Sequence, residues 1–83
     1  MSRKLLFTPI EFTKDPHEGG EVLKGIAVNL CEGGMRVYAY CPLSEGDRIS
    51  VLSPLPTPHK RFIVQWIEQL LDGFFVLGLI FEL

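Results

Sequence analysis

The stretch AVNLCEGGM, residues 27–35, joins an apolar segment to an amide, a thiol, a carboxylate and two adjacent glycines. Its flanking residues alternate between apolar and polar types, as a β-strand does, and the glycines favour a tight turn at its end. Two interpretations follow. Asn29 and the sequence Glu32-Gly33-Gly34 serve turn formation alone, or the polar side chains line a binding site on the surface of a sheet.

The other residues able to do chemistry are Cys31, Cys41, His17 and His59. They show no Cys-x-x-Cys or His-x-x-x-His spacing, so we expect no metal site and no cofactor. If both cysteines flank one hairpin, they lie about 20 Å apart along its ladder, too far for a disulfide. No pattern orients a Cys–His nucleophilic pair, and we therefore expect a protein that is not an enzyme. The basic cluster at residues 59–61 is either a solvated strand start or an anion site.

The sequence is rich in strand signals, so we expect a β-sheet to position these residues. Segments with β-branched and aromatic residues, separated by Gly, Pro and Asp, predict six strands at residues 6–13, 22–30, 35–40, 48–52, 61–69 and 74–83. A short six-stranded antiparallel sheet hides its edges most easily by closing into a barrel. We therefore expect an all-β fold, a small six-stranded antiparallel β-barrel without a C-terminal helix.

Alternation divides each strand between two faces. The sets expected to share one face are Ile26, Val28 and Leu30; Met35, Val37 and Ala39; and Phe62, Val64 and Trp66. The opposing sets are Ala27, Asn29 and Cys31; Arg36, Tyr38 and Tyr40; and Arg61, Ile63 and Gln65.

Both faces of the last strand are apolar. Phe74, Val76 and Ile80 oppose the odd-numbered set Phe75, Leu77, Leu79, Phe81 and Leu83. Because a barrel wall has only one inside face, one of these sets must point outward. This predicts a homodimer, or a complex with another protein, through the outer face of residues 74–83, which Leu77→Glu or Leu79→Glu would break if the odd-numbered set faced out.

Composition limits the class of protein. The chain has 83 residues, 47% of them hydrophobic and 22% charged, which suits a single globular domain over residues 1–83. A net charge of −2 argues against general nucleic-acid binding, including a single-strand interface built on Tyr38, Tyr40 and Arg36. Neither a signal peptide nor an apolar run of membrane-spanning length is visible, so we expect a soluble, cytoplasmic protein with no membrane insertion.

Four motifs in order resemble those of PilZ domains. They are Asn29-x-Cys31-x-Gly33-Gly34, Leu43-x-x-Gly46-Asp47-Arg48-Ile49-x-Val51, Ile63-Val64-Gln65-Trp66-Ile67 and Phe74-Phe75-Val76-Leu77-Gly78-Leu79-x-Phe81. The first is similar to the (Asp/Asn)-x-Ser-x-Gly-Gly signature of the family, and the resemblance extends from about residue 5 to residue 83.

The resemblance implies a six-stranded barrel that binds cyclic diguanylate (cyclic di-GMP), a bacterial second messenger. In that family an Arg-x-x-x-Arg pair before the first strand binds phosphates and guanine edges, and the Asx and Ser positions hydrogen-bond the ligand. A planar guanidinium suits that role because it donates two parallel hydrogen bonds. Carried over to this chain, the ligand-binding residues are Arg3, Lys4, Asn29, Cys31, Gly33 and Gly34, with residues 1–7 as an N-terminal arm.

Two positions depart from the family pattern. With Arg3 as the first arginine, the second falls on Phe7, and Lys4 supplies charge without the bidentate fork. Cys31 replaces the serine, and a thiol is a weak donor. The sequence therefore leaves two functions open: a bacterial signalling receptor or adaptor that binds cyclic diguanylate, and a degenerate PilZ domain that binds no nucleotide and acts through protein contacts.

Overall fold

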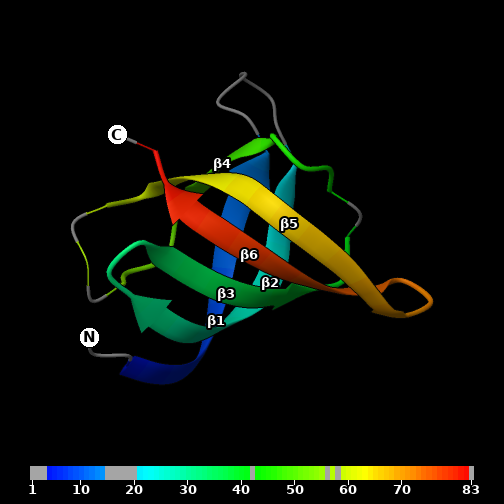
Figure 1. The fold of residues 1–83 in the computed structure, drawn as a ribbon, viewed down its shortest axis with the longest axis horizontal. Helices are drawn as coiled ribbons and strands as arrows, with labels where there is room; N and C mark the ends of the chain where they lie inside the picture. The colour runs from blue at the N-terminus through cyan, green and yellow to red at the C-terminus, as the bar shows by residue number, and fades with distance from the viewer. Residues whose placement is uncertain (1–3, 15–20, 42, 56, 58, 83) are drawn as a thin grey trace.

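A computed structural model describes residues 4–14, 21–41, 43–55, 57 and 59–82, with backbone only for residues 4–6. Six antiparallel strands close into a barrel in the order β1-β2-β3-β6-β5-β4 (Figure 1). The strands are β1 (Lys4–Lys14), β2 (Val22–Cys31), β3 (Gly34–Ala39), β4 (Arg48–Val51), β5 (Arg61–Leu71) and β6 (Phe74–Phe81). This part of the chain contains no helix. The predicted six-stranded antiparallel barrel is confirmed.

The strand ends lie within two residues of the predicted ones. β1 begins at Lys4, so residues 4–7, which were expected to form an arm, belong to the sheet. Two hairpins close where the sequence placed tight turns: β2 and β3 are joined by Glu32-Gly33, and β5 and β6 by Asp72-Gly73. Gly73 has a φ of +73°, a left-handed conformation that a residue with a Cβ adopts only with strain.

The interior is a single apolar cluster to which all six strands contribute. Its members are Ile10, Phe12, Ala27, Met35, Val37, Ala39, Leu43, Ile49, Val51, Phe62, Val64, Leu77 and Leu79. Met35, Val37 and Ala39, which were expected to share one face of the third strand, all belong to this cluster, so that face is the inner one. Arg36 and Tyr40 on the opposing set are exposed, and Tyr38 is half-buried.

The final strand presents its odd-numbered side chains to the core. Leu77 and Leu79 belong to the central cluster, and Phe75 and Phe81 pack against it. The outward set is therefore the even-numbered one, with Phe74, Val76 and Ile80. A dimer built on this outer face cannot be broken specifically by Leu77→Glu or Leu79→Glu, because both changes would bury a charge inside the barrel.

Two β-bulges correct the predicted faces. In β2 the register with β3 shifts between Ala27 and Asn29, so that Ala27 is inside the barrel and Asn29 pairs with the exposed Arg36. In β5 the register with β6 shifts between Val64 and Trp66, and Trp66 lies opposite Gly78 instead of continuing the inward set. Uniform alternation failed at both places because a bulge adds one residue and reverses the faces beyond it.

Candidate functional site

A hollow of about 240 Å³ opens on the outer surface of the barrel beside the β2–β3 turn. It is lined by Asn29, Cys31, Gly33, Gly34, Met35, Arg36, Gln65, Trp66, Gly78, Leu79 and Ile80. These residues come from β2, β3, β5 and β6 and from the turn itself. The site is thus a shared surface of four strands, brought together by the pairing of β3 with β6.

Glycines make the hollow possible. A Cβ at Gly34 would lie 2.8 Å from the carbonyl carbon of Leu79 and 2.9 Å from the Cα of Ile80, closer than carbon atoms approach. A Cβ at Gly78 would overlap the indole ring of Trp66. Backbone therefore replaces side chains at these two positions, and Trp66 can lie against β6.

Trp66 forms the aromatic wall of the hollow, and the positively charged side chain of Arg36 lies over its ring. The guanidinium carbon lies 5.7 Å from the centroid of the Trp66 ring, within cation–π range. Arg36 and Trp66 both face Gly78, from β3 and β5 respectively. Arg36 is exposed and forms no ion pair with the described residues, so its five N–H donors are available to a ligand.

Asn29 and Cys31 line the hollow from β2. Asn29 pairs with Arg36 across the β2–β3 ladder, and Cys31 pairs with Gly34. The Cys31 thiol donates to the carbonyl oxygen of Gly34 over 3.7 Å. The described residues that line the hollow include neither a carboxylate nor an imidazole, and what they offer is amide and guanidinium hydrogen bonds and an aromatic surface.

The structure brings together four of the six residues expected to bind ligand. Asn29, Cys31, Gly33 and Gly34 all line the hollow. Lys4 pairs with Leu30 through its backbone, so β1 begins next to Asn29. Arg3 lies outside the described residues.

Sequence reasoning missed Arg36, Gln65, Trp66 and Gly78. Trp66 was part of a motif but was placed on the same face as Phe62 and Val64, because nothing in the sequence marks the bulge at Gln65. A signal was present in Gly78, an isolated glycine within an apolar strand, which is typical of a position where another group approaches the backbone closely.

The remaining candidates for chemistry lie away from the hollow. Lys60 of the basic cluster donates to the Ser53 carbonyl over 2.9 Å, Arg61 lies 3.7 Å from the Glu82 carboxylate, and the His59 ring packs 4.6 Å from Phe81. Within the described ranges the cluster is therefore occupied by protein partners. His17 lies outside those ranges, and the described His, Cys, Asp and Glu residues form no group of three that could bind a metal.

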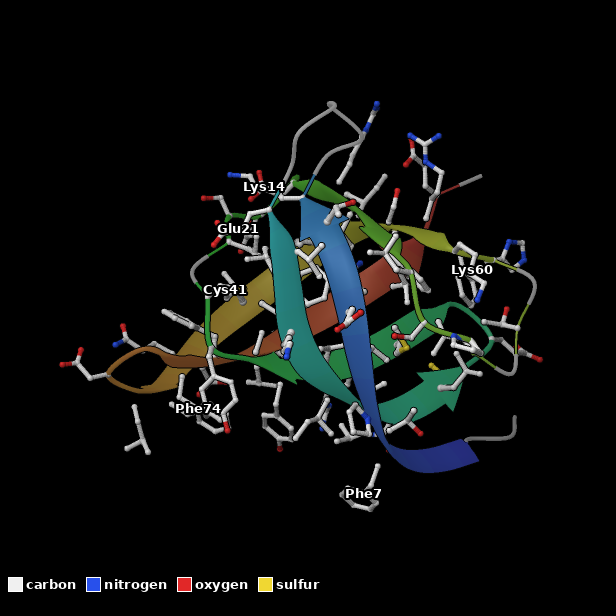
Figure 2. The ribbon with its side chains drawn as sticks, turned by 180° about the vertical axis from the view of Figure 1, so that it is seen from behind. Phe7, Lys14, Glu21, Cys41, Lys60 and Phe74 are labelled. Atoms are coloured by element: carbon white, nitrogen blue, oxygen red, sulfur yellow. The ribbon has the colours of Figure 1, made fainter. Side chains whose placement is uncertain are left out.

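Both cysteines are free thiols, as their separation predicted. Burial raises the pKa of the Cys41 thiol above its ordinary value of 9.0, a backbone hydrogen bond at Cys41 opposes this, and the charge of Glu21 adds to the increase. Cys41 and Glu21 are labelled in Figure 2. Cys41 does not line the hollow.

Comparisons with protein-family models, with curated proteins and with solved structures find no match to this chain. No helix in the described residues is long and apolar enough to span a membrane.

Proposed function

We propose that this chain is a non-enzymatic signalling domain of the PilZ type that binds cyclic diguanylate at the hollow beside the β2–β3 turn. The messenger is made and read in the bacterial cytoplasm, and we place the protein there. The observation that carries this proposal is the convergence of Asn29, Cys31, Gly33 and Gly34 on one hollow. The sequence motif by itself predicts that these four residues bind one ligand.

The chemistry of the hollow supports such a ligand. The Asn29 amide offers a donor and acceptors, and the Arg36 guanidinium can bind an oxygen pair through two parallel hydrogen bonds. The Trp66 indole offers a surface on which a base can stack. Gly33 has open space where a Cβ would project, so a ligand can approach the turn backbone.

The N-terminal segment supplies the remaining contacts in this proposal. β1 begins at Lys4, opposite Leu30, and Leu5 pairs with Asn29, so the first described residues of the chain lie beside the strand that carries Asn29. Phe7 stands where the family has its second arginine. If that arginine contributes about 1.5–3 kcal/mol, its absence weakens binding by roughly one to two decades relative to a complete site.

Isothermal titration of the purified protein with cyclic di-GMP tests the proposal, with the linear dinucleotide as the ligand control. We expect saturable binding of the cyclic form, and Asn29→Ala and Arg3→Ala should each weaken it by about tenfold or more. Gln69→Ala is the matched control for Asn29, because it removes an exposed amide from β5 outside the hollow. Arg48→Ala is the control for Arg3, because Arg48 lies on β4 and faces Glu82.

If millimolar cyclic di-GMP produced neither heat nor a thermal shift, the proposal that this chain is a receptor would be wrong. Equal weakening by Gln69→Ala and Asn29→Ala would place the binding site elsewhere on the barrel.

A second candidate function is supported by an apolar surface at the β5–β6 hairpin, which projects from the barrel (Figure 1). We name it the hairpin patch and define it by Tyr38, Tyr40, Leu70, Leu71 and Phe74. The Phe74 ring lies 5.6 Å from that of Tyr38 and 5.0 Å from that of Tyr40, while Leu71 and Tyr40 are 68% and 66% exposed. Exposed apolar groups gathered in this way favour a protein contact.

In this second candidate the chain is an adaptor that binds no nucleotide and forms a homodimer through the hairpin patch and the outer face of β6. Sedimentation should then show a dimer at tens of micromolar that Leu71→Glu dissociates. Leu52→Glu is the matched control, since Leu52 is 54% exposed but lies outside the patch. A wild-type protein that stays monomeric at millimolar concentration would contradict the dimer.

A further inference from the structure

The hollow has the size of part of a dinucleotide. Its volume of about 240 Å³ lies below the roughly 300–1,000 Å³ of pockets that enclose a whole drug-sized ligand. A cyclic dinucleotide contains two bases and two phosphates. One planar group of such a ligand can therefore enter the hollow, while the rest must lie on the surface outside it.

The lining residues favour a neutral ring with a polar edge over a phosphate. Among the lining residues that the structure describes, Arg36 is the one cationic side chain, and two carboxamides, Asn29 and Gln65, are the other strong hydrogen-bonding groups. A phosphate site usually gathers several cations or backbone N–H groups. Carboxamides provide both donors and acceptors, as the edge of a nucleobase requires.

The Arg36–Trp66 pair adds stacking and selectivity. The indole lies where a Gly78 side chain would otherwise be, which fixes the aromatic surface against β6. The Arg36 guanidinium lies over that ring, 5.7 Å from its centroid, and because Arg36 is exposed it can turn aside to the edge of a base that stacks on the indole. Arginine binds the O6 and N7 acceptors of guanine bidentately, whereas adenine presents a donor in place of O6.

We propose, building on the ligand class proposed above, that the hollow binds a single guanine base, which stacks on Trp66 and is read at its O6/N7 edge by Arg36. Arg36 on β3 thereby supplies a guanidinium in place of the arginine that is missing at position 7. The proposal assigns Arg36 and Trp66 to the ligand site, and it predicts that mononucleotides carrying guanine bind to the same hollow.

Trp66 is the single tryptophan of the chain, so its fluorescence reports directly on the hollow. Titrations of the full chain with GMP, AMP, cyclic di-GMP and cyclic di-AMP should be followed by tryptophan emission and by calorimetry. We expect GMP and cyclic di-GMP to quench Trp66 saturably, with the guanine ligands binding roughly five- to 100-fold tighter than their adenine counterparts.

Two variants assign the roles. Arg36→Ala should weaken GMP binding roughly five- to 100-fold and remove most of the preference for GMP over AMP, because the lost contact is to the guanine edge. Trp66→Leu, followed by calorimetry, should weaken GMP and AMP alike by a similar factor, because stacking is tolerant of base identity. The matched controls are Arg48→Ala and Phe74→Leu, which remove an arginine and an aromatic side chain that do not line the hollow.

The outcomes separate this inference from the proposed function. Calorimetric binding of cyclic di-GMP that leaves wild-type Trp66 emission unchanged would overturn the guanine pocket and leave the receptor function intact. Binding of GMP without cyclic di-GMP would support the pocket and overturn the receptor function. If Arg36→Ala weakened GMP and AMP equally, the assignment of Arg36 to the guanine edge would be wrong, and if no probe bound, both proposals would fall. Circular dichroism of each variant distinguishes lost binding from lost fold.

Discussion

The indole of Trp66 occupies the space that a side chain at Gly78 would require. The two residues face each other across the β5–β6 ladder, immediately after a bulge in β5. Strict alternation from Phe62 and Val64 would place Trp66 inside the barrel, but after the bulge it lies on the outer surface. It also shapes one wall of the candidate site, because Arg36, the partner of Gly78 on β3, lies over the same ring.

Gly78→Ala should therefore displace Trp66. The added methyl group meets a bulky ring packed on backbone, and overpacking of this kind costs about 1–3 kcal/mol of unfolding free energy. We also expect Trp66 emission to shift to longer wavelength as the ring becomes more exposed. Urea unfolding and emission spectra measure the two effects. Gly33→Ala is the control, since a Cβ there has no heavy atom within 4 Å. Equal stability of wild-type and Gly78→Ala proteins would mean that Trp66 moves aside without cost.

Leu79→Glu should unfold the protein and Phe74→Glu should not, because the two residues lie on opposite faces of β6. Leu79 is 2% exposed within the core, and an ionised carboxylate there should cost about 4 kcal/mol or more. A domain of this size has a total stability of roughly 4–12 kcal/mol, so the variant should be largely or wholly unfolded. Phe74 lies on the outer face and is half-buried, and its substitution should leave the circular dichroism spectrum native. A folded Leu79→Glu protein would contradict the assigned faces.

Cys41 should make stability fall at alkaline pH. Its folded pKa is raised above 9.0, so the unfolded thiol ionises first as the pH increases. The contribution of Cys41 is therefore fully present below pH about 9 and is lost as the pH rises through the folded pKa. Urea unfolding at pH about 7.5 and about 10 should show a smaller decline in Cys41→Ala than in the wild type.

Glu21→Gln tests the electrostatic part of the same effect. The Glu21 charge raises the folded pKa of Cys41, so its removal should make the alkaline decline smaller and end it at lower pH, while the onset stays at the pKa of the unfolded thiol. A wild type whose stability changed no more than that of Cys41→Ala would show that the thiol ionises alike in both states.

Local chemistry was enough to predict the barrel. Turn residues such as Asp72-Gly73 set the hairpin ends, and β-branched and aromatic residues set the strands between them. The face of each residue was predictable only up to the first bulge. Ala27 and Trp66 lie next to bulges. A bulge depends on how two neighbouring strands pair, which the sequence of one strand does not show.

The candidate site was predictable to the same extent. Asn29 and Cys31 flank a turn that the sequence shows directly, so their common surface followed from alternation near the hairpin end. Arg36 and Trp66 reach the hollow because β3 pairs with β6 and β6 with β5, and these pairings link residues far apart in the chain. Their proximity was accessible only from the three-dimensional structure.

Phe7→Arg tests the register of the N-terminal segment. Phe7 is 79% exposed and points away from the barrel (Figure 2), so its replacement should change the free energy of unfolding by no more than about 0.5 kcal/mol. If Arg3 and position 7 form the family pair, the new guanidinium should tighten cyclic di-GMP binding by roughly tenfold or more, since a charge-assisted hydrogen bond contributes about 1.5–3 kcal/mol. Phe7→Lys separates charge from geometry, because it restores the charge without the bidentate fork. Calorimetry on the folded variants would then rank arginine above lysine and lysine above phenylalanine. An affinity unchanged by Phe7→Arg, in a protein as stable as the wild type, would show that position 7 does not face the ligand and that the register assigned to the N-terminal segment is wrong.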